Sequence, residues 1–199
     1  MTEALQAGAF GAWVEQMRGA LAGGPDPDVP CGTCTACCRS SQFVHIGPTE
    51  SDALAHVPRS LRFPAPGMPG HVLLPYDARG CCPLVETSGC GIYAHRPKTC
   101  RTYDCRLFAA TGVADVPPPV AAQVARWRFS YGSDGERARH EALVAAAQHL
   151  AAHRGELPVP PSGIGLAIAA LAVYELFLVG PVDTDTLRAR LVALRDARG

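Results

Sequence analysis

The pattern of apolar and polar residues divides the chain into helical ends and an irregular middle. Near the start, Leu5–Leu21 carries apolar residues at helical spacing, which predicts a helix that docks on the core through one face. The residues on that face are Phe10, Trp13, Val14, Met17 and Leu21. The stretch "GGPDPDVP" then ends the helix and leads into a run of cysteines.

The middle of the chain alternates between short strands, short helices and loops rich in proline and glycine. "SQFVHIGP" and "HVLLPY" alternate apolar and polar residues over a few positions, and each predicts a short strand. Between them, "TESDALAHV" predicts a short helix with Thr49 as its N-cap. Further on, Pro97 suits the first turn of a helix over "PKTCRTYDCRLFAA".

The C-terminal half contains no cysteine and has a mainly helical pattern. Its first segment, "QVARWRFSYG", is ambiguous, because its apolar residues fit both helical spacing and the alternation of a strand. The motif "SDGE" then forms a capping box from Ser133 to Glu136 and predicts a helix that extends to about His153.

Two more helices are predicted after the break at "LPVPPSG". Ile164–Val179 is the most apolar segment. Its length of about sixteen residues and its internal Glu175 favour a buried core helix, since a membrane span takes about twenty residues. The last predicted helix, Asp183–Ala197, is amphipathic. The residues of its inward face are Leu187, Leu191 and Leu194.

Composition narrows the class of protein. The chain has 199 residues and is 48% hydrophobic, which suits one globular domain, or one domain with a small subdomain. Its formal net charge of +0 gives no support to a nucleic-acid or membrane partner. The first residues lack the basic start and apolar core of a secretory signal, so we expect a cytoplasmic protein.

These patterns predict an α+β protein that is mostly helical, with a small cysteine-rich, metal-organised subdomain of short strands and loops. We expect an N-terminal helix over residues 1–24, a cysteine-cluster metal-binding domain over 31–110 and a helical region over 118–199 packed on that domain. We also expect metal binding to be coupled to folding, because the loop-rich cysteine region has few periodic apolar elements of its own.

All nine cysteines lie between Cys31 and Cys105. An odd, clustered set in a reducing compartment indicates metal binding or redox chemistry before disulfide pairing. The stretch "CGTCTACC" contains two overlapping C-x-x-C turns, Cys31–Cys34 and Cys34–Cys37. Such a turn brings two thiolates to one metal ion, and small intervening residues leave room for it.

Two cysteine pairs are adjacent in sequence, Cys37–Cys38 and Cys81–Cys82. Neighbouring side chains diverge, so two neighbours rarely bind one tetrahedral ion. Either one member of each pair is a buried spare, or the pairs serve two centres or a polynuclear cluster. Cys100 and Cys105 would lie about 140° apart on one helix, which suits separate atoms of a cluster or one structural cysteine.

This arrangement resembles the CxxCxxCC family of cysteine-cluster proteins, which is described as zinc- or iron-chelating. The resemblance covers about residues 31–105 and rests on three blocks: "CGTCTACC", Cys82 before "PLV", and "CGIYAHRPKTCR". It implies a metal centre held by cysteine thiolates. Cys81 and Cys105 depart from the family pattern; Cys81 looks dispensable, and Cys105 looks like an addition.

The candidate metal ligands are eight cysteines: Cys31, Cys34, Cys37, Cys38, Cys82, Cys90, Cys100 and Cys105. Tyr93, Arg96 and Arg101 lie between ligands, and arginine donors there would offset the negative charge of a thiolate cluster. A surface or phosphate-binding role is the alternative for the two arginines. His45 and His95 are further candidate ligands, although a histidine in a loop is more often exposed or hydrogen-bonded.

The favoured cofactor is an iron–sulfur cluster, with zinc or iron ions as the alternative. The favoured function is metal binding by thiolates. Its alternatives are an iron-dependent oxidoreductase or modifying enzyme acting on a small molecule or peptide, and a zinc-stabilised protein-interaction module. No catalytic triad, carboxylate pair or phosphate loop stands out. The small-molecule or protein partner is not identified, and neither nucleic acid nor a membrane is expected as a partner.

Overall fold

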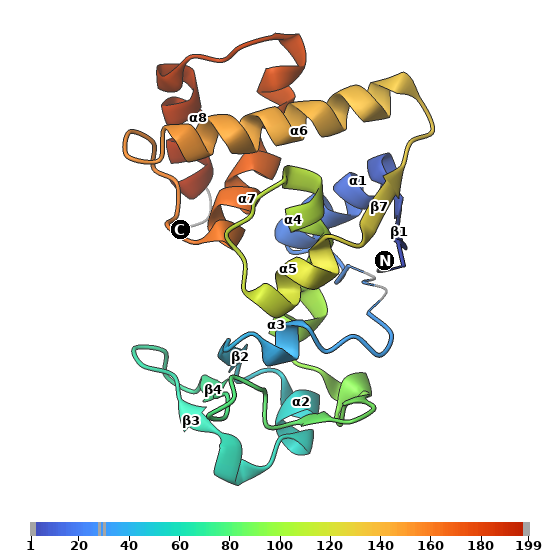
Figure 1. Cartoon of the computed structure of the whole chain (residues 1–199). Helices are drawn as coiled ribbons and strands as arrows, with labels where there is room; N and C mark the ends of the chain where they lie inside the picture. The colour runs from blue at the N-terminus through green and yellow to red at the C-terminus, as the bar shows by residue number, and fades with distance from the viewer. Residues whose placement is uncertain (1–2, 28, 30, 197–199) are drawn as a thin grey trace. The chain divides into compact units, whose positions relative to one another are not determined.

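Helices and three small sheets make up the part of the chain that the computed structural model describes, residues 3–27, 29 and 31–196, so the fold is α+β as predicted. The chain divides into two units (Figure 1). The first consists of Met1–Ala22, Cys105–Val116 and Ala121–Gly199, and the second of Gly23–Asp104 and Pro117–Val120. The predicted packing of a helical region on a cysteine domain stays a prediction.

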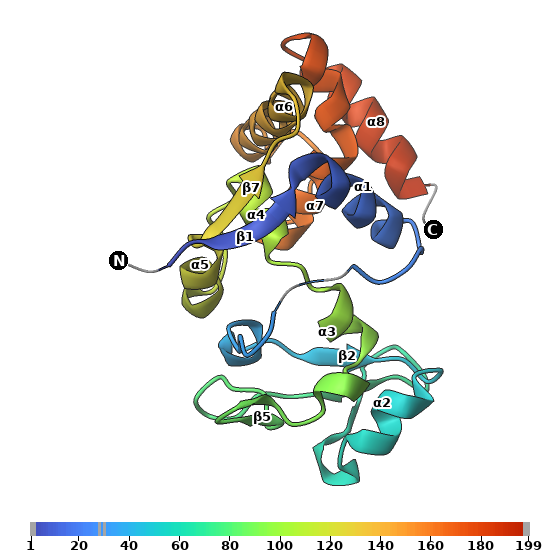
Figure 2. The ribbon, with the colours of Figure 1, turned by 90° about the vertical axis from the view of Figure 1, so that its right-hand side faces the viewer.

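The first unit begins with a strand where the apolar pattern predicts a helix. Leu5–Ala9 forms β1, and the helix α1 covers only Phe10–Leu21. Gly8 has φ of 95°, a left-handed conformation that no α-helix contains, so the helix does not extend back to Leu5. β1 pairs in parallel with β7 (Trp127–Ser130), which resolves the ambiguous segment as a strand (Figure 2).

The long helix α6 (Asp134–Ala152) begins at the predicted cap, and this prediction is confirmed. Ser133 Oγ accepts a hydrogen bond from the Glu136 backbone N–H at 3.3 Å. Glu136 Oε2 accepts from the Gly132 N–H instead of that of Ser133. α6 therefore has a side-chain cap at its first turn, where backbone donors otherwise lack partners.

The apolar segment after α6 forms two elements, α7 (Gly163–Val173) and the 3-10 helix η4 (Tyr174–Val179), both of which contact α6. α7 begins one residue before its predicted start, and a Cβ on Gly163 would lie 1.9 Å from the Asp115 carbonyl oxygen. Only glycine permits this close approach.

The last helix of the first unit is α8 (Thr184–Asp196), and Ala197 of the predicted range lies outside the described residues. Leu187 and Leu191 are buried, and Leu194 is half-buried. In the part of the chain that the structure describes, no helix combines the length and apolar character needed to cross a membrane.

The second unit contains the two predicted strands and two short helices. β2 (Val44–Ile46) and β3 (Phe63–Pro64) both pair antiparallel with β4 (Val72–Leu74), and β5 (Val85–Glu86) pairs with β6 (Gly89–Cys90). The helix α2 (Ser51–His56) begins two residues after Thr49, and Glu50 occupies its N-cap position instead. Ile46, Ala53, Val57 and Leu74 form the small core of this unit.

One predicted helix is divided at the boundary between the units. The stretch "PKTCRTYDCRLFAA" forms α3 (Lys98–Thr102) in the second unit and α4 (Arg106–Thr111) in the first. Tyr103, with extended backbone, ends α3, and Cys105 is the N-cap residue of α4. The helix α5 (Pro118–Val124) follows α4. The remaining elements are the 3-10 helices η1 (Cys37–Arg39), η2 (Arg59–Leu61) and η3 (Tyr93–His95).

Candidate metal centre

A cavity of about 80 Å³ in the second unit brings together seven of the eight predicted ligands. The cysteines that line it are Cys31, Cys34, Cys37, Cys38, Cys82, Cys90 and Cys100. Four come from the first cysteine run, and the others come from the loop after β4, the end of β6, and α3. All nine cysteines of the chain are thiols, not disulfides.

Backbone hydrogen bonds join the first cysteine run to the second. The Cys82 N–H donates to the Cys38 carbonyl oxygen at 2.6 Å, and the Ser41 N–H donates to the Gly80 carbonyl oxygen at 2.9 Å. Gly80 has φ of 75°, and a Cβ there would lie 2.3 Å from Ser41 Oγ. Glycine at this position therefore allows the two runs to approach each other.

The two adjacent pairs of cysteines differ in how they face the cavity. Cys37 and Cys38 both line it, and they lie on the 3-10 turn of η1. In the other pair only Cys82 lines the cavity. Cys81 is 6% exposed, and its Sγ accepts a hydrogen bond from Arg39 Nη1 at 3.7 Å.

The eighth predicted ligand, Cys105, is not among the residues that line the cavity of the second unit. It belongs to the first unit, at the N-cap of α4. Trp127 Nε1 donates a hydrogen bond to its Sγ at 3.1 Å. This contact joins α4 to β7, which is a structural role.

Of the predicted non-cysteine residues, Tyr93 and Arg96 line the cavity. The Arg96 guanidinium lies 3.7 Å from the centroid of the Tyr93 ring, and Arg96 Nε donates to the Tyr93 carbonyl oxygen at 2.9 Å. Arg101 is not among the lining residues and pairs with Asp26, at 2.6 Å between Nε and Oδ2. Arg96 is therefore the arginine placed to offset thiolate charge.

The two candidate histidines have other partners. His45 Nε2 hydrogen-bonds to His71 Nδ1 at 2.9 Å, and His95 Nδ1 lies 3.0 Å from Asp52 Oδ2. Neither lines the cavity. Several residues with apolar or neutral side chains that were not predicted also line the cavity, such as Phe43, Leu74 and Tyr103. No chemical motif marks these residues in the sequence.

Burial and mutual repulsion keep most of the cavity thiols protonated when no cation is bound. Burial, with a smaller contribution from the charge of Cys38, raises the pKa of Cys100 to about 12. Burial also raises the pKa values of Cys82 and Cys90, and the backbone N–H groups of Leu84 and Ile92 partly oppose this. A bound cation would offset the negative charge of several thiolates at once and so favour their deprotonated form.

Cys37 and Cys38 share a hydrogen bond that divides them into a donor and an acceptor. This bond is the main cause that lowers the pKa of Cys38 and raises that of Cys37. The charges of Arg39 and Arg96 also favour the Cys38 thiolate. Within this pair, Cys38 is therefore the thiol that more readily becomes a thiolate.

The cysteine sulfurs that line the cavity are the donor atoms that a thiophilic metal prefers. A tetrahedral zinc ion with Zn–S bonds of about 2.3 Å keeps its sulfurs about 3.8 Å apart. The seven thiols that line the cavity are more than one such ion can bind.

Comparison with known families and proteins adds one match. Residues 30–116 match the model of the CxxCxxCC family, described as "Putative zinc- or iron-chelating domain". The match covers the seven cavity cysteines as well as Cys81 and Cys105. Comparison with curated proteins and with solved structures finds no match.

Proposed function

We propose that the seven cavity cysteines hold an iron–sulfur cluster, since residues 30–116 match a family model described as a "Putative zinc- or iron-chelating domain". The observation that carries this proposal is that seven thiols line one cavity. A mononuclear tetrahedral site uses four ligands, fewer than the thiols present. A polynuclear cluster distributes its thiolates over separate metal atoms.

The adjacent pair Cys37–Cys38 contributes two thiols to the proposed ligand set, because both line the cavity. Cys105 is left out of the proposed ligand set, because its Sγ already accepts a hydrogen bond from Trp127 in the first unit.

The groups around the thiols have defined roles in this proposal. The backbone N–H groups of Leu84 and Ile92 interact with Cys82 and Cys90, and Arg96 adds a positive charge to the cavity wall. Donors of this kind stabilise ligating thiolates and tune their electronic properties. A bound iron–sulfur cluster supplies one-electron redox chemistry. We propose a cytoplasmic location, where thiols remain reduced.

The experiment that tests the proposal is elemental analysis with an absorption spectrum, on protein purified without oxygen. We expect iron and acid-labile sulfide together, with a broad absorption band near about 400 nm from thiolate-to-iron charge transfer. A colourless protein with zinc in place of iron would contradict the proposal. That result would favour a zinc-stabilised interaction module, and the search would turn to protein partners.

A further inference from the structure

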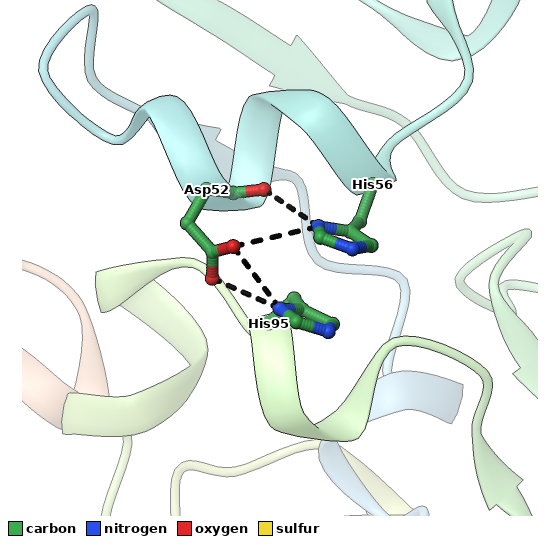
Figure 3. A group of neighbouring side chains, drawn as sticks. All are labelled: Asp52, His56 and His95. Carbon is green, nitrogen blue, oxygen red and sulfur yellow. Dashed lines mark hydrogen bonds and ion pairs between the residues drawn. The ribbon is translucent and has the colours of Figure 1, made fainter.

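Three side chains of the second unit converge outside the cysteine cavity. Asp52 and His56 come from α2, and His95 comes from η3 (Figure 3). One potential ligand atom of each lies within 4.8 Å of the other two. His95 Nδ1 is 3.0 Å from Asp52 Oδ2, and His56 Nδ1 is 3.6 Å from Asp52 Oδ1. None of the three lines the cysteine cavity.

The packing of α2 and η3 keeps these three side chains close to one another. Asp52 and His56 are four residues apart on α2, so they lie on the same helical face. α2 buries Ala53 in the small core of this unit, and Ile92 packs against the same apolar core just before η3. Glu50 adds a second link, because its carboxylate accepts hydrogen bonds from the backbone N–H groups of both Gly47 and Lys98.

The donor set has the chemistry of a transition-metal site. Two imidazoles and one carboxylate suit divalent first-row cations, with water in the remaining positions. Neighbouring ligands around an ion with bonds of about 2.1 Å lie about 3.0 to 3.4 Å apart, and the two imidazole Nδ1 atoms lie 3.0 and 3.6 Å from carboxylate oxygens of Asp52. The side chains of Asp52, His56 and His95 are 67%, 41% and 38% exposed, so a cation and its waters can reach them.

Without a cation the three groups satisfy one another. His56 Nδ1 lies 2.9 Å from the Asp52 carbonyl oxygen, and the two imidazole rings are stacked with centroids 3.4 Å apart. Parallel rings do not direct their lone pairs at one point, so binding requires both rings to turn about their χ2 angles. Their exposure permits this rotation.

We propose that Asp52, His56 and His95 form a surface site for a divalent first-row cation that prefers nitrogen and oxygen ligands, such as Ni²⁺ or Zn²⁺. The site uses no thiol and is separate from the cysteine centre. It therefore does not depend on which metal the cysteines hold.

The test is a calorimetric titration with Ni²⁺ of the full chain, purified without oxygen and carrying its native metal. We expect the substitutions Asp52→Asn and His95→Gln each to weaken nickel binding at least about tenfold. Circular dichroism checks that both variants are folded. The native metal content, measured before and after, shows that nickel has not displaced the metal at the cysteines.

The matched control is His153→Gln. His149 lies in the last turn of α6 and His153 is the C-cap residue of that helix. Their rings are stacked with centroids 4.2 Å apart, so they are a competing pair of imidazole ligands. Nickel affinity that survives His153→Gln and falls in both other variants supports the proposal. The proposal is overturned if the wild-type chain binds no nickel, if Asp52→Asn binds as tightly as wild type, or if His153→Gln abolishes binding.

Discussion

Trp127 Nε1 donates a hydrogen bond to the Sγ of Cys105 at 3.1 Å, inside the unit that holds none of the seven cavity cysteines. Trp127 is 5% exposed, so its indole N–H has little access to water. A buried donor without a partner is costly, and Cys105 supplies the acceptor. This hydrogen bond gives Cys105 a structural partner within the first unit.

We predict that Cys105→Ala leaves the metal content unchanged but lowers the free energy of unfolding by about 1–3 kcal/mol, because it removes the acceptor for Trp127. Cys105→Ser retains an oxygen acceptor and is expected to lose less. Metal analysis and urea unfolding on both variants provide the check. Loss of the metal in either variant would assign Cys105 to the metal centre.

The adjacent cysteines Cys81 and Cys82 differ in whether they line the cavity. We predict that Cys82→Ala greatly reduces the metal content and that Cys81→Ala retains it, because only Cys82 lines the cavity. The backbone hydrogen bond from Cys82 to Cys38 needs no side chain, so Cys82→Ala does not break that link. Equal metal loss from both variants, measured by elemental analysis, would refute the assignment.

His140 gives the first unit a defined response to acid. Its ring stacks on Phe10 at 4.5 Å between centroids, and burial lowers its pKa below the ordinary value. Below about pH 6.5 the unfolded chain binds a proton that native His140 does not, so stability falls as the pH drops from about 6.5 toward the lowered pKa.

We therefore predict that His140→Phe, which cannot be protonated, loses less stability than wild type between about pH 7 and about pH 5.5. Urea unfolding curves at both values, followed by circular dichroism, give the two differences. A second variant, His140→Gln, also removes the titration while changing the packing on Phe10. If both variants lose as much stability as wild type, His140 is not protonated in this range upon unfolding.

The cap of α6 is a local interaction whose cost can be measured. Ser133→Ala removes the oxygen that accepts from the Glu136 N–H, and we expect a loss of about 1 kcal/mol. Ser133→Asp keeps a capping oxygen and is expected to stay close to wild type. Thermal unfolding would show a midpoint about 2–4 °C lower for Ser133→Ala alone. An unchanged midpoint would mean that the cap adds nothing to stability.

The sequence predicts the features that depend on nearby residues. The α6 cap lies within four residues, and the overlapping C-x-x-C turns lie within eight. Both can therefore be predicted from a short stretch of sequence. β1 was not predictable, since it pairs with β7 about 120 residues away and the apolar pattern of Leu5–Leu21 fits a helix throughout.

The roles of individual cysteines and histidines depend on tertiary partners. The family resemblance separates Cys82 from Cys81 in the sequence, and the packing of Cys81 beside Arg39 gives a physical reason for the difference. Similarly, Cys105 differs from Cys100 because Trp127 lies next to it. His95 is a loop residue in the sequence, and its place beside Asp52 follows from the packing of η3 near α2.

The most direct test of the central claim is native mass spectrometry, without oxygen, of the 20.9 kDa chain and its Cys34→Ser and Cys105→Ser variants. The account predicts a mass increment that contains both iron and sulfide in wild type and in Cys105→Ser, and no such increment in Cys34→Ser. An increment equal to zinc alone would contradict the iron–sulfur cluster. An iron–sulfur increment that survives Cys34→Ser and disappears in Cys105→Ser would contradict the ligand set.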